Sequence, residues 1–173
     1  TQSITVTSAG SYSVTVTNAS GCSATSAATA VTVNALPTAT ITAGGATTFC
    51  AGGSVTLTSS AGSSYLWSTG ATTQSIIATT SGSYTVTVTN ASGCSATSAT
   101  TAVTVNDLPT VTISAGGATT FCAGGSVTLT SSAGSSYLWS TGATTQSIIA
   151  TTAGSYSVTV TNASGCSATS AAT

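Results

Sequence analysis

Hydrophobic and polar residues alternate with a period of two over short segments, and turn residues separate these segments at intervals of roughly 8–12 positions. Within residues 36–107 the alternation predicts strands at 38–42, 54–60, 64–68, 73–79, 84–89 and 101–106. In the segment 84–89, Tyr84, Val86 and Val88 fall on one face and three threonines fall on the other. No segment has the hydrophobic spacing of an amphipathic helix. The pattern therefore predicts an all-β fold.

The pattern repeats with a period of 72 residues. Residues 36–101 align with residues 108–173 and differ at only five positions, and residues 1–29 align with residues 73–101. A repeat of this length suits one small domain rather than one turn of a solenoid, which takes about 20–45 residues. We therefore expect the C-terminal part of one repeat at 1–35, a complete repeat at 36–107, and a repeat at 108–173 that lacks its last strand and leaves a sheet edge open. The cuts in mid-repeat are typical of a window on a longer array.

Composition limits the partners and the chemistry. Lys, Arg and His are absent, Asp107 is the single acidic residue, and Ser and Thr supply 74 of 173 residues. Without cations the chain cannot neutralise phosphates, which excludes nucleic acids and anionic membrane surfaces as electrostatic partners. No apolar run approaches the roughly 20 residues that span a bilayer, so this window inserts into no membrane. General acid–base catalysis needs His, Lys or paired carboxylates, and calcium sites need several carboxylate oxygens. We expect no enzyme, no cofactor and no metal site.

The five cysteines recur at fixed positions: Cys22, Cys94 and Cys166 are 72 residues apart, as are Cys50 and Cys122. They lie beside Gly-rich turns, in the segments "FCAGG" and "ASGC". No CxxC spacing accompanies them, which argues against a structural zinc site. Cysteines at fixed sites in short repeats indicate disulfides and an oxidising compartment, while buried free thiols are the alternative.

The unit "FCAGGSVTLTSSAGSSYLWSTGATTQSI…GSYTVTVTNASGCSAT" resembles the Ig-like and PKD-like repeats of long secreted surface proteins of Bacteroidetes, and it is similar to the SprB-type repeats of gliding-motility adhesins. The resemblance implies tandem immunoglobulin-like β-sandwich domains in a linear array at the cell surface. "YLWSTG" resembles their Trp-bearing strand C. "SGSYTVTVT" resembles the start of strand F, where a Tyr hydroxyl bonds back to the backbone. The acidic turn of PKD domains is here Ser68-Thr69-Gly70-Ala71, without a carboxylate.

The cysteine pairing has two readings. By default each repeat closes its own bridge, Cys50–Cys94 and Cys122–Cys166, and Cys22 pairs outside the sequence. In an immunoglobulin topology, however, strands B and F run parallel in opposite sheets, which puts a cysteine before B and a cysteine after F at opposite ends. The default pairing then requires segment 73–79 to return directly as a hairpin from strand C. If it does not, Cys50 bridges to Cys166 and links neighbouring repeats.

Four aromatic residues and three asparagines complete the candidate residues. We interpret Trp67, Trp139, Tyr84 and Tyr156 as core residues, while the alternative for the tryptophans is stacking on sugars. Asn18, Asn90 and Asn162 each begin an Asn-Ala-Ser sequon and are candidate glycosylation sites. The alternative is a purely structural role in a tight turn, which Asn and Gly favour.

Near-identical repeats indicate that the chain supplies length more than any single site. The sequence predicts a structural stalk or filament segment of a secreted bacterial surface adhesin, whose partners are neighbouring repeats and, by lateral association, other fibres. The alternatives are a multivalent module that binds glycan or a partner through its loops, a polymer joined by strand exchange, and an ice-binding surface of outward threonines. Identical loops in both copies favour the spacer.

Overall fold

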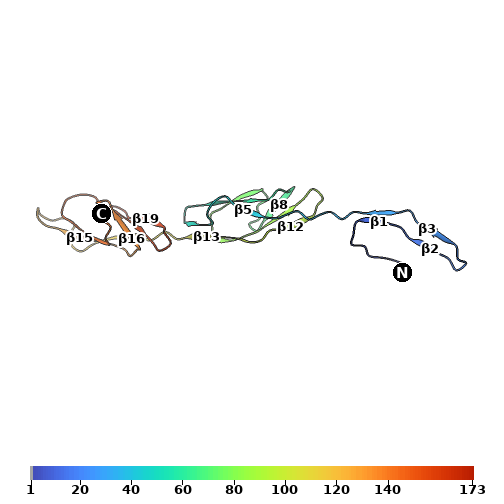
Figure 1. The fold of residues 1–173 in the computed structure, drawn as a ribbon. Helices are drawn as coiled ribbons and strands as arrows, with labels where there is room; N and C mark the ends of the chain where they lie inside the picture. The colour runs from blue at the N-terminus through green and yellow to red at the C-terminus, as the bar shows by residue number, and fades with distance from the viewer. Residues whose placement is uncertain (1) are drawn as a thin grey trace. The chain divides into compact units, whose positions relative to one another are not determined.

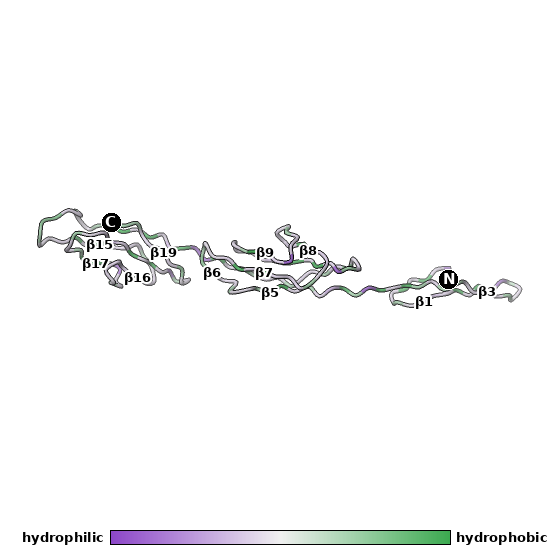
Figure 2. The backbone as a smooth tube through the Cα atoms, turned by 90° about the horizontal axis from the view of Figure 1, so that it is seen from above, coloured by the Kyte–Doolittle hydropathy of each residue, from purple (hydrophilic) through white to green (hydrophobic). Residues whose placement is uncertain are grey.

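The computed structural model describes residues 2–173, so position 1 of the predicted segment 1–35 lies outside them. Within these residues the fold is all-β, as the alternation predicted: strands and turns without a helix (Figure 1). Hydropathy along the backbone changes over short stretches rather than in long blocks (Figure 2), which is what short alternating strands produce.

Residues 2–173 contain nineteen strands. The N-terminal part has β1 (Gly10–Tyr12), β2 (Thr15–Thr17), β3 (Ser23–Thr25) and β4 (Thr29–Val31). The middle repeat has β5 (Ile41–Ala43), β6 (Thr48–Cys50), β7 (Val55–Ser59), β8 (Ser64–Trp67), β9 (Ser75–Ala78), β10 (Gly82–Tyr84), β11 (Val86–Thr89), β12 (Ser95–Thr97) and β13 (Thr101–Asn106). The last repeat has β14 (Ile113–Ala115), β15 (Val127–Ser131), β16 (Ser136–Trp139), β17 (Ser147–Ala150), β18 (Val158–Thr161) and β19 (Ser167–Thr169).

The chain forms two compact units whose boundaries fall inside the sequence repeat. The first unit comprises Thr1–Ile41, Ser59–Gln74 and Thr85–Ala99, and the second comprises Thr42–Thr58, Ser75–Tyr84 and Thr100–Thr173. The repeat 36–107 therefore contributes strands to both units, while the repeat 108–173 lies wholly in the second.

The first unit contains two two-stranded sheets and one three-stranded sheet. The two-stranded sheets are β1–β4 and β2–β3, and most of their side chains are exposed. The sheet has the order β12-β11-β8, antiparallel throughout. It buries Trp67, Val86 and Val88 on one face, as the period-two pattern requires.

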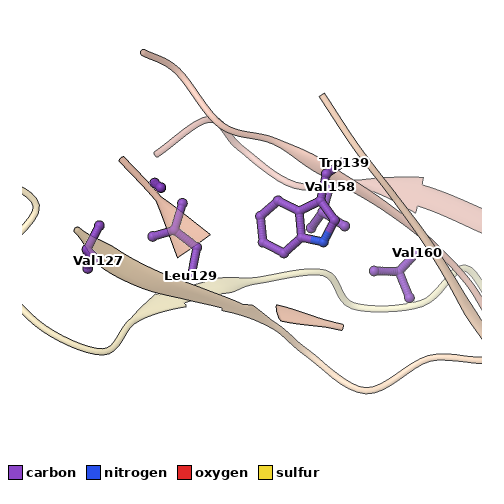
Figure 3. Packing of buried hydrophobic residues seen from close by; sticks show 6 residues of the cluster. Val127, Leu129, Trp139, Val158 and Val160 are labelled. Atoms are coloured by element: carbon purple, nitrogen blue, oxygen red, sulfur yellow. The ribbon is translucent and has the colours of Figure 1, made fainter. Parts of the chain in front are cut away.

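The second unit contains all the strands of the repeat 108–173. In the repeat 108–173, the sheets β14-β15-β17 and β16-β18-β19 are both antiparallel. One buried cluster draws side chains from both sheets, so the sheets pack face to face; its members are Val127, Leu129, Trp139, Ala150, Val158 and Val160. In Figure 3 the Trp139 indole lies between Leu129 and Val160. The core of this repeat sits between its two sheets.

Residues of the repeat 36–107 add two further sheets to the second unit. One has the order β5-β7-β9, and the other has the order β10-β13-β6. Within the latter, β13 runs antiparallel to β10 and parallel to β6. The first half of β13 thus pairs on one side and its second half on the other, which makes β13 the strand that joins both neighbours.

Each of three tyrosines bonds back to the backbone four residues upstream. The hydroxyls of Tyr12, Tyr84 and Tyr156 donate to the carbonyl oxygens of Ser8, Thr80 and Thr152, at 2.9, 2.9 and 2.8 Å. This is the hydrogen bond that the resemblance of the Gly-Ser-Tyr segment to the start of strand F implied. It lets the phenol reach the interior while its polar end stays satisfied.

Candidate functional site

The recurring segment "NASGC" folds as a turn held by its asparagine. Asn162 Oδ1 accepts the backbone N–H groups of Ser164 and Cys166, both at 3.0 Å, and the Asn162 N–H donates to the Cys166 carbonyl at 2.9 Å. Gly165 has a φ of 78°, a left-handed conformation that glycine adopts without strain. Copies at 18–22 and 90–94 make the same bonds. The sequence of the turn therefore fixes where its cysteine lies.

The other end of the asparagine amide binds the connection between repeats. Asn162 Nδ2 donates to the Asp107 carbonyl at 2.8 Å, and Asn90 Nδ2 donates to the Ala35 carbonyl at the same distance. Two of the three sequon asparagines thus hold a turn with the amide oxygen and a connection with the amide nitrogen. A glycan on Nδ2 would have to displace or share that bond, so these contacts favour the turn interpretation of Asn90 and Asn162.

Cys50 is placed by the parallel pairing of β6 with β13. The register sets Asn106 opposite Cys50, and the Asn106 carbonyl accepts the Ala51 N–H at 2.8 Å. The Gly53 N–H then donates to the Cys50 carbonyl at 2.9 Å and closes a tight turn. Cys50 therefore lies beside Asn106, close to the point where the chain passes from the repeat 36–107 to the repeat 108–173.

Cys50 and Cys166 form a disulfide, with their Cα atoms 5.6 Å apart and a sequence separation of 116. Cys166 is fully buried, and its Sγ lies 3.8 Å from the Asn106 carbonyl oxygen. The bridge joins the repeat 36–107 to the repeat 108–173. The default prediction of Cys50–Cys94 and Cys122–Cys166 is wrong: the alternative pairing is the one observed, and Cys22, Cys94 and Cys122 are free thiols.

Strand direction explains why a repeat does not close its own bridge. The short loop 132–135 makes β16 run back from the end of β15, and β18 is antiparallel to β16. Strands β15 and β18 therefore run the same way. Because Cys122 precedes β15 and Cys166 follows β18, the two cysteines lie at opposite ends of the repeat. A disulfide requires Cα atoms within about 7 Å.

The hairpin that would have permitted the default pairing does not form. Instead of pairing with β16, β17 pairs with β15 in the opposite sheet. The connection 140–146 first runs back alongside Trp139, and the backbone N–H of Trp139 donates to the Ala143 carbonyl at 2.8 Å. The Ser131 N–H then donates to the Gln146 carbonyl, so β17 starts beside the end of β15.

The free thiol of Cys94 shares one contact with bonded Cys166, although Cys94 is half-buried and Cys166 is fully buried. Cys94 Sγ lies 3.8 Å from the Asn34 carbonyl, just as Cys166 Sγ lies 3.8 Å from that of Asn106. Cys94 and Cys122 form no disulfide, and Cys122 is exposed.

The predicted aromatic core residues differ in how far they are buried. Trp67 and Trp139 are each 2% exposed, and their indole N–H groups donate to the carbonyls of Thr73 and Thr145 at 2.8 Å. Such indoles present no face to a sugar. Tyr84 is buried as well, whereas Tyr156 is half-buried.

Tyr156 is less buried because it lines an open groove of about 530 Å³ in the repeat 108–173. We call this the strand groove. Its remaining wall comes from the loop 119–123, from Val127 and Leu129 on β15, from residues 150–154 and from Thr173. The walls are a mixture of apolar side chains and threonines.

Chemistry-bearing groups are sparse throughout. In residues 2–173, no group of three or more His, Cys, Asp or Glu side chains lies together in a way that could hold a metal. Nor does this part of the chain contain a helix long and apolar enough to cross a membrane. The junction disulfide fits an oxidising, non-cytoplasmic environment.

The sequence did not reveal that two backbone carbonyl groups take part in the junction between repeats. The Asn106 carbonyl accepts the Ala51 N–H and lies beside Cys166 Sγ, and the Asp107 carbonyl accepts a hydrogen bond from Asn162 Nδ2. Backbone groups carry no residue signature, so the 72-residue spacing of "NASGC" was the only available hint.

No family model matches the chain, and no curated protein sequence matches it.

Proposed function

We propose that this chain is a stalk or filament segment of a secreted bacterial surface adhesin, built from near-identical immunoglobulin-like repeats. The observation that carries the proposal is the Cys50–Cys166 disulfide, which links one repeat to the next instead of closing either. A bridge of this kind keeps neighbours together under load. That property matters for a spacer and is of little use to an isolated binding domain.

The noncovalent contacts at the junction support the same role. The asparagine bond to the connection recurs at Ala35 and at Asp107 with the same 2.8 Å distance. Each repeat therefore attaches to its neighbour in the same way, as a periodic stalk requires. The Tyr corner and the buried Trp strand support immunoglobulin-like repeats.

Outward threonines have a structural explanation that favours a stalk over an ice-binding surface. Their hydroxyls bond to each other across strands, as in Thr87–Thr97 at 2.9 Å and Thr159–Thr169 at 2.8 Å. Cross-strand Thr pairs stabilise a sheet. They give an uncharged polar face without any requirement for a ligand.

Single-molecule force extension tests the mechanical role. The chain is pulled from both ends, first with its disulfide intact and then after the disulfide has been reduced. In the oxidised chain, the segment between Cys50 and Cys166 stays closed, so full extension falls short by roughly 40 nm, at about 3.5 Å for each of 116 residues. Equal extension in both states would contradict a load-bearing junction.

Localisation and binding are tested separately. Antibodies against the repeat should label intact producing cells without permeabilisation, and labelling that requires permeabilisation would exclude the surface location. Saturable binding of the isolated chain to glycans would instead support the binding-module alternative.

A further inference from the structure

Strand β9 forms one edge of its sheet in the repeat 36–107, and β17 forms the same edge in the repeat 108–173. The sheet orders are β5-β7-β9 and β14-β15-β17, so each of these strands has one neighbour. Both strands read Ser-Ile-Ile-Ala. Each keeps four consecutive pairs with its neighbour, without a bulge. The two repeats therefore present the same regular edge.

The open side of this edge presents the backbone of one isoleucine. The Ser59 N–H donates to the Gln74 carbonyl at 2.9 Å, and hydrogen-bonded pairs recur at every second residue of an antiparallel ladder. The backbone groups of Ile76 therefore face β7, whereas the N–H and C=O of Ile77 face away from it. The last repeat has the same bond between the end of β15 and the residue before β17, so the backbone of Ile149 also faces outward.

The side chains of these two isoleucines are exposed as well. Ile77 is 70% exposed and Ile149 is 69% exposed, because both project from the outer face of the sheet. One end of the edge is occupied, since the Thr145 hydroxyl donates to the Ser147 carbonyl at 2.6 Å. The open part of the edge is therefore centred on Ile149 in β17 and on the equivalent Ile77 in β9.

The neighbouring edge of the other sheet is closed by its own turn. Strand β8 is the edge of the sheet β12-β11-β8. Its Trp67 N–H donates to the Ala71 carbonyl at 2.9 Å, and the Gly70 N–H donates to the Trp67 carbonyl at 2.8 Å. Leu66 on the same strand is 55% exposed. Strand β8 thus has an outward aliphatic side chain beside a backbone that is already occupied, which makes it a natural comparison for β9.

The chemistry of the open edge specifies an uncharged strand as its partner. Soluble proteins protect edge strands with lysine, proline or a bulge, and residues 73–80 and 145–152 contain no lysine, no proline and no charge. A charged partner strand would bury a charge without a counterion, because the chain has no Lys, Arg or His and its one carboxylate side chain is Asp107. The same edge of a second copy is a strand without charge.

We propose that a second copy of this chain pairs with this edge, through antiparallel contact between the β9 or β17 strands of the two copies. The contact is self-complementary. With Ile77 of one copy opposite Ile77 of the other, each backbone N–H donates to the other carbonyl, and a two-fold axis relates the copies. Both side chains then lie on the same outer face and cover each other. The two three-stranded sheets become one continuous sheet.

One contact of this kind is small, because each edge offers one open N–H and one open C=O at its centre. Two such edges are present in residues 2–173, and linked weak contacts gain affinity through a high effective concentration. The formal net charge of −1 gives little repulsion between copies. Copies therefore associate side by side. This would let a stalk form bundles, but the inference rests on the two edges and not on the stalk function.

Sedimentation equilibrium of the full chain over a concentration series tests the association, with the free thiols alkylated so that no disulfide links the copies. We expect reversible association. Ile77→Lys with Ile149→Lys should abolish it, because like charges would lie opposite each other, and Ile77→Lys alone should weaken it. Leu66→Lys with Leu138→Lys is the matched control on β8 and β16, and it should associate as the parent chain does.

Hydrogen exchange locates the contact. At a chain concentration about ten times the dissociation constant, exchange of the Ile77 and Ile149 amides should slow about tenfold relative to the dilute chain, as mass action requires. The Ile76 amide faces β7 and should exchange at nearly the same rate at both concentrations. Ile77→Pro with Ile149→Pro removes only the outward donors and should also prevent association.

The lysine variants keep the test decisive where the proline variants fail to fold, which circular dichroism reports. A monomer at every concentration would leave the edge to some other partner and overturn the proposal. Equal weakening by the Leu66→Lys and Leu138→Lys control would show general hydrophobic adhesion and would also overturn it. So would association that leaves the amides of Ile77 and Ile149 unprotected.

Discussion

Asn162 reaches across the connection between repeats and donates its amide N–H to the Asp107 carbonyl at 2.8 Å, while its amide oxygen holds the turn that carries Cys166. One side chain thus couples the position of a cysteine to the position of the connecting segment. The disulfide joins parts of the chain that these hydrogen bonds also hold together.

Asn162→Asp separates these two roles, because it keeps the acceptor and loses the donor. We expect it to destabilise the chain by about 0.5–1.5 kcal/mol, the net contribution of one hydrogen bond, because Asp107 is exposed and water can solvate its carbonyl when the donor is lost. Asn162→Ala loses the turn bonds as well and should cost about 2–3 kcal/mol. Urea denaturation measures both. Asn18→Asp, in an exposed turn, is the matched control, and an equal loss there would contradict a specific role for the connection.

Removal of the junction bridge should lower stability without changing the fold. In the chain-entropy model a loop of 116 residues is worth about 5 kcal/mol, so Cys50→Ser with Cys166→Ser should lose roughly 3–5 kcal/mol. Denaturation with and without a reductant measures the loss. Cys94→Ser with Cys122→Ser is the control and should denature like the parent chain. A map in which Cys50 is joined to Cys94 would refute the pairing.

Gly134 leaves space for a core valine. A Cβ built on it would collide with Val160 Cγ1, and Val160 is fully buried. Gly134→Ala therefore overpacks the core, and we expect a loss of about 1–3 kcal/mol in thermal or urea denaturation. Gly117→Ala is the matched control, because a Cβ there meets nothing within 4 Å and its φ is not left-handed. Equal stability of the two variants would show that Val160 moves aside without cost.

How far the sequence predicts the structure depends on whether a feature is local. Alternation placed Val86 and Val88 inward and Thr87 outward, and the Gly-Ser-Tyr corner predicted the bond from Tyr84 to the backbone, because each depends on a few neighbouring residues. The cysteine pairing depends instead on where strand β17 pairs. Direct return beside β16 and crossing to β15 fit the same local pattern, so the sequence left both pairings open. The backbone carbonyls that accept hydrogen bonds from Asn162 and Asn90 lie 55 residues away in the sequence, and a backbone carbonyl has no residue signature.

Trp139 is the residue on which the core of the last repeat depends most. It is 2% exposed and lies in the cluster with Leu129, Val158 and Val160 (Figure 3). Trp139→Ala should cost about 3–5 kcal/mol, because it removes the largest buried side chain and leaves a cavity. Leu138→Ala, one residue earlier on the outer face and 55% exposed, should change stability by less than about 0.5 kcal/mol. Urea denaturation followed by circular dichroism compares the two, and a similar loss for both would show that the inward and outward faces of β16 are wrongly assigned.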